Sequence, residues 1–410
     1  MQLKLLNIHK LLANFATNLV GAFIPIIVFE ATGSMFLGVL TYLLQYLIRM
    51  LVTIILRKQF ETKPQLMLMF GAIPILMYSI FVIVINYNLW VGVVGVIIFN
   101  GVNSAFTAMP REYILNYASL NNNNEESSLG FTRFIEQVGV FISYLVGGYL
   151  LGINKIIVVA ISIAIYLASV VPLVMFYNKS KTEKTFNSDA VSNAQLTFKA
   201  NNTEKYNYGK VLSKKLILIY GITYFIYCFV DAFLKLFNIH LFATTDSYAI
   251  AGVFNAIYNA SYGVGCYVFG KIAEKKDILI HVIVCLVVMG VSVLCISFID
   301  SLWLRYVLFG VLGFAYSPVP LFNFQRLITK SRILGKSNTA LYVREQSSNI
   351  SVIVACSAGL FGTIVPCFIL IASTLFASAG IIPYHEEKSR RLLVDYLQFN
   401  EITSKRRRGR

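Results

Sequence analysis

The chain has 410 residues, of which 57% are hydrophobic and 13% are charged, and its formal net charge is +16. Water-soluble domains carry about 25% charged residues, so this composition excludes a water-soluble globule. Twelve apolar stretches account for it, and each is long enough for a membrane helix, which needs about 20 residues to cross a hydrocarbon core ~30 Å thick. We predict these stretches at residues 9–29, 35–57, 65–86, 88–110, 130–152, 154–178, 215–238, 247–271, 277–299, 302–327, 338–362 and 364–384.

The stretches form two sets of six, separated by a polar interval rich in Lys, Asn and Ser. Backbone groups in lipid must be hydrogen-bonded within their own segment, which selects helices for apolar runs of this length. We therefore predict an all-α membrane protein with 12 transmembrane helices in two pseudo-symmetric six-helix bundles. Its parts are an N-terminal bundle 1–178, a cytoplasmic linker 179–214, a C-terminal bundle 215–384 and a basic cytoplasmic tail 385–410.

Basic residues concentrate in every second gap between the stretches. Loops rich in Lys and Arg stay in the cytoplasm, so we expect both termini there. The abundance of Asn, Lys and Ile favours the cytoplasmic membrane of a bacterium. Attraction of these loops to an anionic leaflet explains the net charge without a nucleic-acid partner, and we expect a monomer in the lipid bilayer. The basic residues outside this pattern are Arg49, Arg133, Lys155, Lys235, Arg305 and Arg344.

Residue clusters typical of catalysis or metal binding are sparse in the sequence. The six cysteines lie within apolar stretches of the second half, as expected for small buried hydrophobes, and indicate neither a disulfide framework nor a metal site. The run His385-Glu386-Glu387 lacks the second histidine of a zinc-protease motif. Because no nucleophile–base pattern and no phosphate-binding glycine loop is evident, we expect no enzyme, no cofactor and no direct use of ATP.

Two polar stripes occupy matching positions in the two halves. In the second stretch, four residues share one helical face because they lie at i, i+3, i+4 and i+7, and adding 213 to their numbers gives a polar stripe in the eighth stretch. Duplicated halves with matching polar faces suit a two-lobed transporter with a central cavity. We predict that both stripes bind substrate: Tyr42, Gln45, Tyr46, Arg49, Asn255, Tyr258, Asn259 and Tyr262.

Three short motifs, together with the division into six and six, resemble the major facilitator superfamily across nearly the whole chain. The loop 270–277 reads Gly-Lys-Ile-Ala-Glu-Lys-Lys-Asp, similar to the family's Gly-xxx-acid-base loop. The run 100–105 is similar to the end of its helix-four motif, although Ile97 stands in place of the motif's arginine. The run 139–148 resembles its antiporter motif, with Gly147-Gly148 replacing a Gly-Pro pair.

This resemblance implies two rocking lobes around a central site, hence alternating-access transport of a small or amphipathic solute. Coupling to a proton or ion gradient is expected, and the antiporter-like glycines slightly favour export. One alternative keeps the fold and makes the substrate a lipid or lysolipid, whose phosphate would meet Arg49. Another is a nontransporting membrane sensor, because a fold does not by itself establish transport.

Arg49 is an informative charge because it lies about 12 Å from the inner end of its predicted helix, at 1.5 Å per residue. A charge at such depth marks either a functional site or a pair. In one interpretation Arg49 attracts an anionic group of the substrate, for which a guanidinium is well suited. In the other it extends to the inner surface or pairs structurally with a carboxylate.

The seventh stretch carries a further stripe, Tyr220, Tyr224, Tyr227, Asp231 and Lys235, with spacings of three and four residues. We predict Tyr224 and Tyr227 near the bilayer midplane, binding substrate, with Asp231 nearer the outside. A carboxylate at membrane depth is costly to ionise, which makes Asp231 a candidate proton carrier. The alternative is a simple Asp231–Lys235 pair at i, i+4.

Charges also begin the fifth and eleventh stretches, near the cytoplasmic face. Opposite charges on the two lobes there predict a cytoplasmic gate, although a structural role is the alternative, and Glu274 has the further alternative of capping helix five. Asn103 is predicted to bind substrate, whereas Asn14 and Asn18 are interpreted as helix packing. The predicted gate residues are Arg133, Glu136, Glu274, Arg344 and Glu345.

Overall fold

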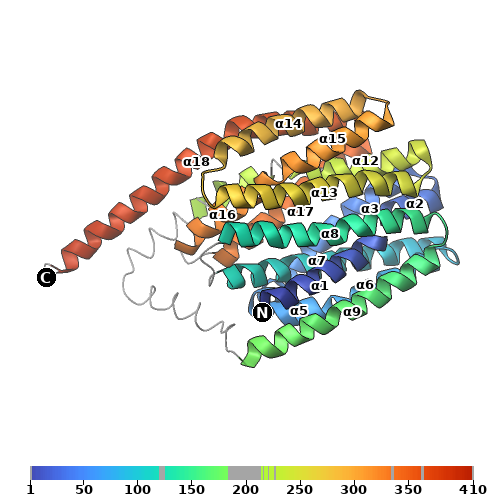
Figure 1. The fold of residues 1–410 in the computed structure, drawn as a ribbon, viewed down its shortest axis with the longest axis horizontal. Helices are drawn as coiled ribbons and strands as arrows, with labels where there is room; N and C mark the ends of the chain where they lie inside the picture. The colour runs from blue at the N-terminus through green and yellow to red at the C-terminus, as the bar shows by residue number, and fades with distance from the viewer. Residues whose placement is uncertain are drawn as a thin grey trace.

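The protein is described by a computed structural model, and the residues it describes form helices joined by short connections, without a β-strand. The described residues are 2–119, 125–182, 214–215, 217–219, 221–225, 228–333, 337–361 and 364–408. Most of the predicted linker 179–214 therefore lies outside the described residues, as does Tyr227. Figure 1 shows the long helices running roughly side by side.

The first half of the chain contributes nine helices to the described structure. Two of its predicted spans are interrupted helices, the first made of α1 and α2 and the third of α5 and α6. The bounds are α1 Gln2–Gly21, α2 Ile24–Thr32, α3 Met35–Ile55, α4 Arg57–Thr62, α5 Pro64–Phe70, α6 Ala72–Val84, α7 Leu89–Ser119, α8 Glu125–Leu151 and α9 Lys155–Thr182.

The second half follows with α12 Phe229–Thr245, α13 Tyr248–Ala273, α14 Leu279–Phe298, α15 Leu302–Tyr316, α16 Pro318–Ile333, α17 Ser337–Phe361 and α18 Ile364–Arg408. Short helical pieces at 214–215, 217–219 and 221–225 precede α12. The helix α18 continues far beyond the predicted end of the twelfth span at residue 384. Figure 1 shows its last turns projecting from the bundle, so the predicted tail begins as part of this helix.

Proline and glycine interrupt several spans where the sequence predicts bending. Pro25 lies in the first turn of α2, directly after the break that separates α1 from α2, and Pro318 begins α16 after Tyr316 has ended α15. Proline lacks an amide donor and cannot continue the hydrogen bonding of a preceding helix. Pro172, by contrast, lies within the continuous helix α9.

Ten helices within the described part of the chain are long and apolar enough to cross a membrane. The two remaining predicted spans correspond to α13 and α17, which have 26 and 25 residues and are therefore long enough. Their polar residues lower their hydropathy, as expected of helices that face a polar interior rather than lipid. Large apolar side chains such as Ile280 and Trp303 are instead exposed on the outside of the bundle. The predicted all-α membrane fold is confirmed.

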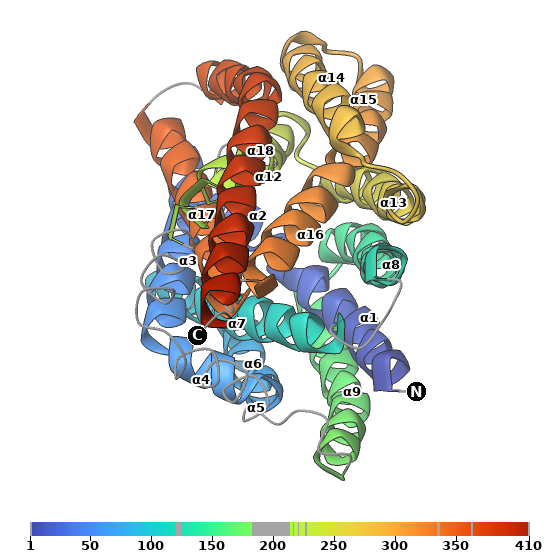
Figure 2. The same ribbon diagram turned by 90° about the vertical axis from the view of Figure 1, so that its left-hand side faces the viewer.

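The two halves meet along two seams, one formed by α8 with α13 and the other by α3 with α17 (Figure 2). At the first seam a Cβ added to Gly130 would lie 2.5 Å from the Cys266 carbonyl oxygen. Towards the other end of the same seam, Gly148 and Gly252 approach so closely that a Cβ on either would lie 3.0 Å from the other's Cα. Glycine thus brings the two backbones together along most of the seam.

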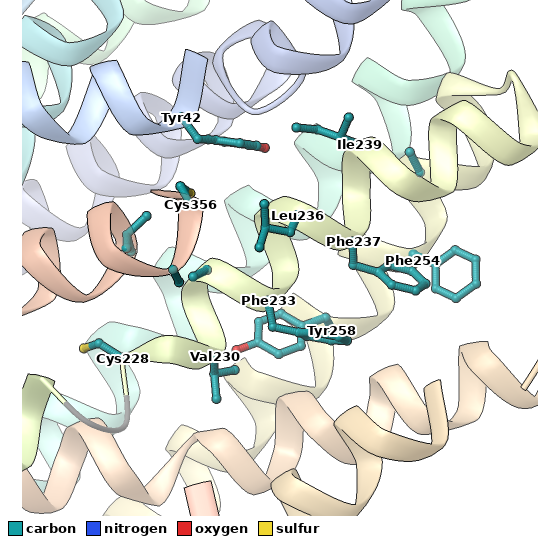
Figure 3. Packing of buried hydrophobic residues seen from close by; sticks show 14 of the residues in the cluster. Tyr42, Cys228, Val230, Phe233, Leu236, Phe237, Ile239, Phe254, Tyr258 and Cys356 are labelled. Atoms are coloured by element: carbon teal, nitrogen blue, oxygen red, sulfur yellow. The ribbon is translucent and has the colours of Figure 1, made fainter. Parts of the chain in front are cut away.

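The second half has an aromatic core around α12 (Figure 3). Phe233 and Phe237 point from α12 towards Phe309 of α15 and Phe368 of α18, with ring centroids 4.8 Å apart for Phe233 and Phe368 and 5.0 Å apart for Phe237 and Phe309. All four side chains are at most 1% exposed. Because close-packed interiors resist deformation, this core fixes α12 within its own half.

The α8–α13 seam can be tested with Gly252→Ala, whose Cβ would lie 2.5 Å from the Tyr144 carbonyl oxygen. We expect it to lower the free energy of unfolding by about 1–3 kcal/mol, because the backbone at Tyr144 cannot move away from the added Cβ as a flexible side chain could. Thermal unfolding in detergent provides the measurement. Gly310→Ala is the matched control: its Cβ would approach no atom closer than 3.4 Å, and helix propensity favours alanine. Equal melting temperatures for the two variants would contradict the close seam.

Candidate functional site

A cavity of about 460 Å³ lies between the two halves of the chain. Its walls come from α1, α3, α7 and α8 in the first half and from α12, α13, α16 and α17 in the second, with Tyr224 just before α12 and Tyr316 at the end of α15. Clefts of this size accommodate small organic ligands. The lining is unusually rich in tyrosine, with Tyr42, Tyr46, Tyr144, Tyr224, Tyr258, Tyr262 and Tyr316.

The two stripes predicted from the sequence both face this cavity. The predicted binding residues on its wall are Tyr42, Gln45, Tyr46, Arg49, Tyr224, Asn255, Tyr258, Asn259 and Tyr262, together with Asp231. Asn103 is fully buried in α7 and does not line the cavity. The stripes lie on α3 and α13, which are the second predicted span of each half. Because both helices line the cavity between the halves, the two stripes face the same space.

Several cavity amides are already occupied by hydrogen bonds within the protein. Asn238 and Asn255 exchange two amide hydrogen bonds, of 3.1 and 2.7 Å, and the Gln45 amide donates to the Ser104 hydroxyl at 3.1 Å. Asn18, predicted to pack against a neighbouring helix, instead lines the cavity, and its amide donates to the Asn14 carbonyl oxygen one turn earlier in the same helix. The Asn238–Asn255 exchange therefore ties α12 to α13 rather than pointing to substrate.

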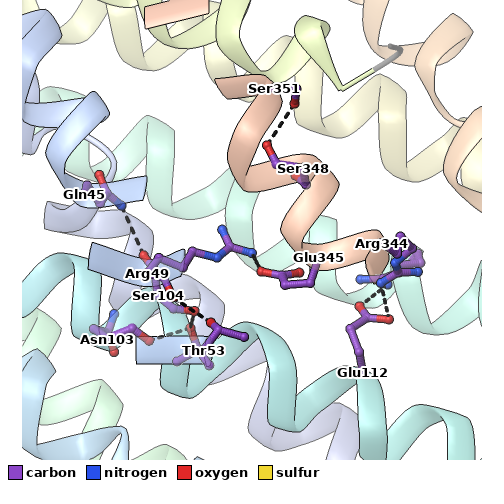
Figure 4. Close-up of polar contacts among 12 residues, drawn as sticks. Gln45, Arg49, Thr53, Asn103, Ser104, Glu112, Arg344, Glu345, Ser348 and Ser351 are labelled. Atoms are coloured by element: carbon purple, nitrogen blue, oxygen red, sulfur yellow. Dashed lines mark hydrogen bonds and ion pairs between the residues drawn. The ribbon is translucent and has the colours of Figure 1, made fainter. Parts of the chain in front are cut away.

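Ion pairs close one end of the cavity, which we call the basic end because Lys10 and Arg111 lie there. Glu112 of α7 accepts a hydrogen bond from Arg133 of α8 at 2.5 Å, and its other carboxylate oxygen lies 2.7 Å from the Arg344 guanidinium of α17 in an ion pair. Arg344 belongs to the second half and Glu112 to the first, so this carboxylate joins the two halves. Figure 4 shows Arg344 and Glu112 facing each other.

Arg49 makes a second connection between the halves. Its guanidinium is hydrogen-bonded to the Glu345 carboxylate of α17, and its side chain is 16% exposed (Figure 4). The structure thus places Arg49 in the paired state that the sequence left as one of two interpretations. Arg49, Glu112, Arg344 and Glu345 all lie on the cavity wall, so the ion pairs form its lining at the basic end.

Glu136 belongs to the same cluster but pairs within the first half. Its carboxylate lies 2.8 Å from the Lys10 ammonium and 3.0 Å from the Arg133 guanidinium. Of the predicted gate residues, Arg133, Glu136, Arg344 and Glu345 come together here. Glu274 does not join them: it is exposed at the end of α13, and no ion pair connects it to this cluster within the described residues.

The sequence analysis missed Glu112 and Lys10 as members of this cluster. The fourth predicted span ended at residue 110, whereas α7 continues to Ser119, so Glu112 lies on a helix beneath the cavity instead of in a loop. The adjacent pair Arg111-Glu112 was the available signal. Lys10 was counted with the basic residues of the N-terminus, yet it is 1% exposed and paired.

Contacts between the halves also exist at the opposite end of the cavity. The Tyr248 hydroxyl at the start of α13 donates to the Glu30 carboxylate of α2 at 2.6 Å, and Lys155 pairs with the same carboxylate. The rings of Phe29 and Phe242 meet edge to face with centroids 6.1 Å apart. The cavity is therefore bounded by contacts between the halves at both ends.

Asp231 and Lys235 project into the middle of the cavity from α12. The seventh span runs over 217–245, farther than the predicted 215–238, so Asp231 lies equally far from both of its ends and not nearer the outside as predicted. Tyr316 lies on the same cavity wall as Asp231. Within the described residues no ion pair joins Asp231 to Lys235, although they are one turn apart.

The described residues contain no group of three or more His, Cys, Asp or Glu side chains that could hold a metal ion. All six cysteines are free thiols, five of them buried. The polar character of the cavity thus comes from tyrosines, amides and ion pairs.

The sequence model of the Major Facilitator Superfamily matches residues 10–343, which include most of both halves. The chain belongs to this superfamily. It is accordingly a multi-pass membrane transporter. Among curated proteins, no sequence matches the chain.

Solved structures show the same fold. The crystal structure of the human organic anion transporter MFSD10 (TETRAN) superposes with a TM-score of 0.61, covering 92% of this chain and 98% of that chain. The two sequences are 11% identical, so the likeness concerns the fold alone.

The Arg49–Glu345 pair can be measured with a double-mutant cycle. Arg49→Gln leaves the buried Glu345 carboxylate without its partner, which we expect to cost about 3–5 kcal/mol of unfolding free energy. The double variant Arg49→Gln with Glu345→Gln should lose less than the sum of the single losses, with a coupling of about 0.5–3 kcal/mol. Thermal unfolding in detergent provides the measurement.

Lys58→Gln is the matched control, because Lys58 is exposed on α4. Its substitution should change the unfolding free energy by no more than about 0.5 kcal/mol. Additive losses for the two members of the pair would show that the contact does not stabilise the junction of the halves.

Proposed function

We propose that the chain is a secondary active transporter that moves a small or amphipathic solute by alternating access. The observation that carries this proposal is the central cavity, bounded at both ends by contacts between the two halves. Rocking the halves about this cavity would open one end while the other stays closed. The division into an N-terminal bundle, a linker, a C-terminal bundle and a tail belongs to the same proposal.

The ion pairs at the basic end are suited to the role of a gate. Arg49–Glu345 and Arg344–Glu112 join side chains from opposite halves, and they lie directly against the cavity. Such contacts can separate and re-form as rigid halves move, whereas a covalent or backbone connection could not. Glu136 pairs with Arg133 and Lys10 within the first half, and so it fixes the position of Arg133, which in turn pairs with Glu112 of the gate.

Asp231 is the candidate for coupling to a proton gradient. It is a carboxylate on the cavity wall, midway along its span. Intramembrane carboxylates of this kind serve as proton carriers in transporters. A proton on Asp231 would remove a charge that otherwise has to be accommodated as the halves move.

Orientation follows from the basic loops. The basic end carries the N-terminus, so the positive-inside rule assigns it to the cytoplasm, with both termini there and the protein in the cytoplasmic membrane of a bacterium. Export is slightly favoured by the glycines of α8, and we expect a monomer to be sufficient. A lipid or lysolipid substrate is the second candidate, favoured by apolar residues such as Leu129, Leu234 and Leu321 on the cavity wall.

Crosslinking across the gate tests alternating access. Asn116 of α7 donates to Asn338 of α17 at 3.2 Å, beside the gate but outside its ion pairs. A short thiol crosslinker joining Asn116→Cys and Asn338→Cys should abolish flux in proteoliposomes, and reduction of a cleavable linker should restore it. The solutes assayed are those that stabilise the purified protein in a thermal-shift screen of metabolites, lipids and drugs at two pH values.

The matched control joins Lys58→Cys and Thr62→Cys, two positions one turn apart on α4 within the first half. It should leave flux unchanged under the same reagent. Full flux through the crosslinked 116–338 variant would refute alternating access at this gate, and bound solutes without any flux in the unmodified protein would favour a sensor.

Proton coupling has its own test in Asp231→Asn. We expect this variant to lose uptake driven by a proton gradient while it retains exchange of labelled for unlabelled solute, because the amide cannot carry a proton between the two sides. Both fluxes are measured in the same proteoliposomes. Unchanged gradient-driven uptake would exclude Asp231 as the carrier.

A further inference from the structure

The charges around the cavity do not all have opposite charges as partners. Of the arginines on the cavity wall, Arg49 pairs with Glu345, Arg133 and Arg344 share Glu112, and Arg111 lies 4.0 Å from Glu136, so each is within ion-pair distance of a glutamate. Lys235 is different. Within the part of the chain that the structure describes, no carboxylate lies within ion-pair distance of its ammonium group.

Aromatic rings hold Lys235 in place instead. Its Nζ atom lies 5.7 Å from the centroid of the Tyr42 ring and 5.2 Å from that of Tyr46. Both tyrosines come from α3 in the first half, whereas Lys235 comes from α12 in the second. A ring face attracts a cation but carries no formal negative charge, so the lysine is positioned without being neutralised.

Asp231 is the carboxylate nearest to Lys235 on the same helix, one turn earlier. Its carboxylate acts on Lys235 electrostatically from there, yet the two groups form no ion pair. Near the middle of a membrane span an ammonium group without a carboxylate in direct contact is costly, and such a charge points to a functional site. The missing opposite charge is what a ligand would supply.

The same cavity also contains buried polar atoms without hydrogen-bond partners. Those on uncharged side chains are Gln45 Oε1, Asn100 Nδ2, Gln137 Oε1 and the Tyr258 hydroxyl. Leaving such groups unpaired costs free energy, so each is available to a polar ligand or to water. Two of them can donate hydrogen bonds, namely Asn100 Nδ2 and the Tyr258 hydroxyl, while the seven tyrosine rings provide flat apolar surface for an organic body.

We propose that the transported solute is a small organic anion with an aromatic or otherwise apolar body, whose carboxylate or phosphate meets Lys235 between Tyr42 and Tyr46. The inference rests on the proposed transport function and names its substrate class. It also reassigns the anion contact that the sequence suggested for Arg49, because Glu345 already neutralises that guanidinium. Lysine acts here as a compact point charge, suited to either anionic group.

Binding to purified protein in detergent tests the proposal without requiring transport. The probes are benzoate and 2-naphthoate, the corresponding phosphates phenyl phosphate and 2-naphthyl phosphate, the neutral amides benzamide and 2-naphthamide, and the cation benzylamine. At millimolar concentrations the anions should raise the melting temperature, and the amides and benzylamine should not. The carboxylate and phosphate series decide which anionic group is preferred.

Three variants locate the site. Lys235→Gln should weaken anion binding on the order of 10- to 100-fold, because a hydrogen-bonded charge is lost, while Lys235→Arg should retain most of it. Lys58→Gln removes a positive charge from the exposed face of α4, outside the cavity, and should leave binding unchanged, which controls for net charge. Ligand-free Lys235→Gln should melt no lower than the unmodified protein, since a costly charge is removed, whereas a structural lysine would give a lower melting temperature.

The outcomes separate this inference from the transport proposal. Anion binding that depends on Lys235 but is followed by no flux in proteoliposomes would retain the site and refute transport. Flux of a neutral or cationic solute that Lys235→Gln leaves intact would retain transport and refute the anion site. Failure of every anionic probe to stabilise the protein, or equal stabilisation of Lys235→Gln, would also overturn the proposal.

Discussion

A charged side chain at membrane depth needs a partner, and in this chain the partners of key charges lie in the opposite half. Arg49 of the first half pairs with Glu345 of the second, and Arg344 of the second half pairs with Glu112 of the first. Removing two charges from water is repaid only when they pair closely. The meeting of the halves at the basic end is therefore an electrostatic requirement, and the polar cavity lies directly against these pairs.

The two seams between the halves have different physical character. At the α8–α13 seam, glycines bring backbone against backbone, as at Gly148 and Gly252, and this contact depends on shape alone. Near the α3–α17 seam, the contact includes the Arg49–Glu345 ion pair. A close-packed seam resists separation, whereas ion pairs can exchange partners or accept water. The ionic seam is consequently the better candidate for opening, with α8 and α13 acting as the pivot.

Lys235 stands apart from this scheme because the protein positions its charge without neutralising it. The rings of Tyr42 and Tyr46 orient the ammonium group from the other half of the molecule. Both halves thus contribute to the same contact, which makes its geometry dependent on how the halves are placed. Natural proteins keep such locally unfavourable groups at functional sites and compensate for them elsewhere in the structure.

The length of an apolar stretch and the spacing of polar residues along a helix are local properties of the chain. They allowed the sequence by itself to determine the twelve-helix membrane fold and the two polar stripes, including Tyr42 and Tyr258. Only the tertiary structure decided which charges meet. Glu345 lies 296 residues from Arg49, and no local pattern connects them. Glu112 and the central place of Asp231 were missed because α7 and α12 extend beyond their apolar runs. Helix ends depend on packing against neighbours, which a single stretch of sequence does not contain.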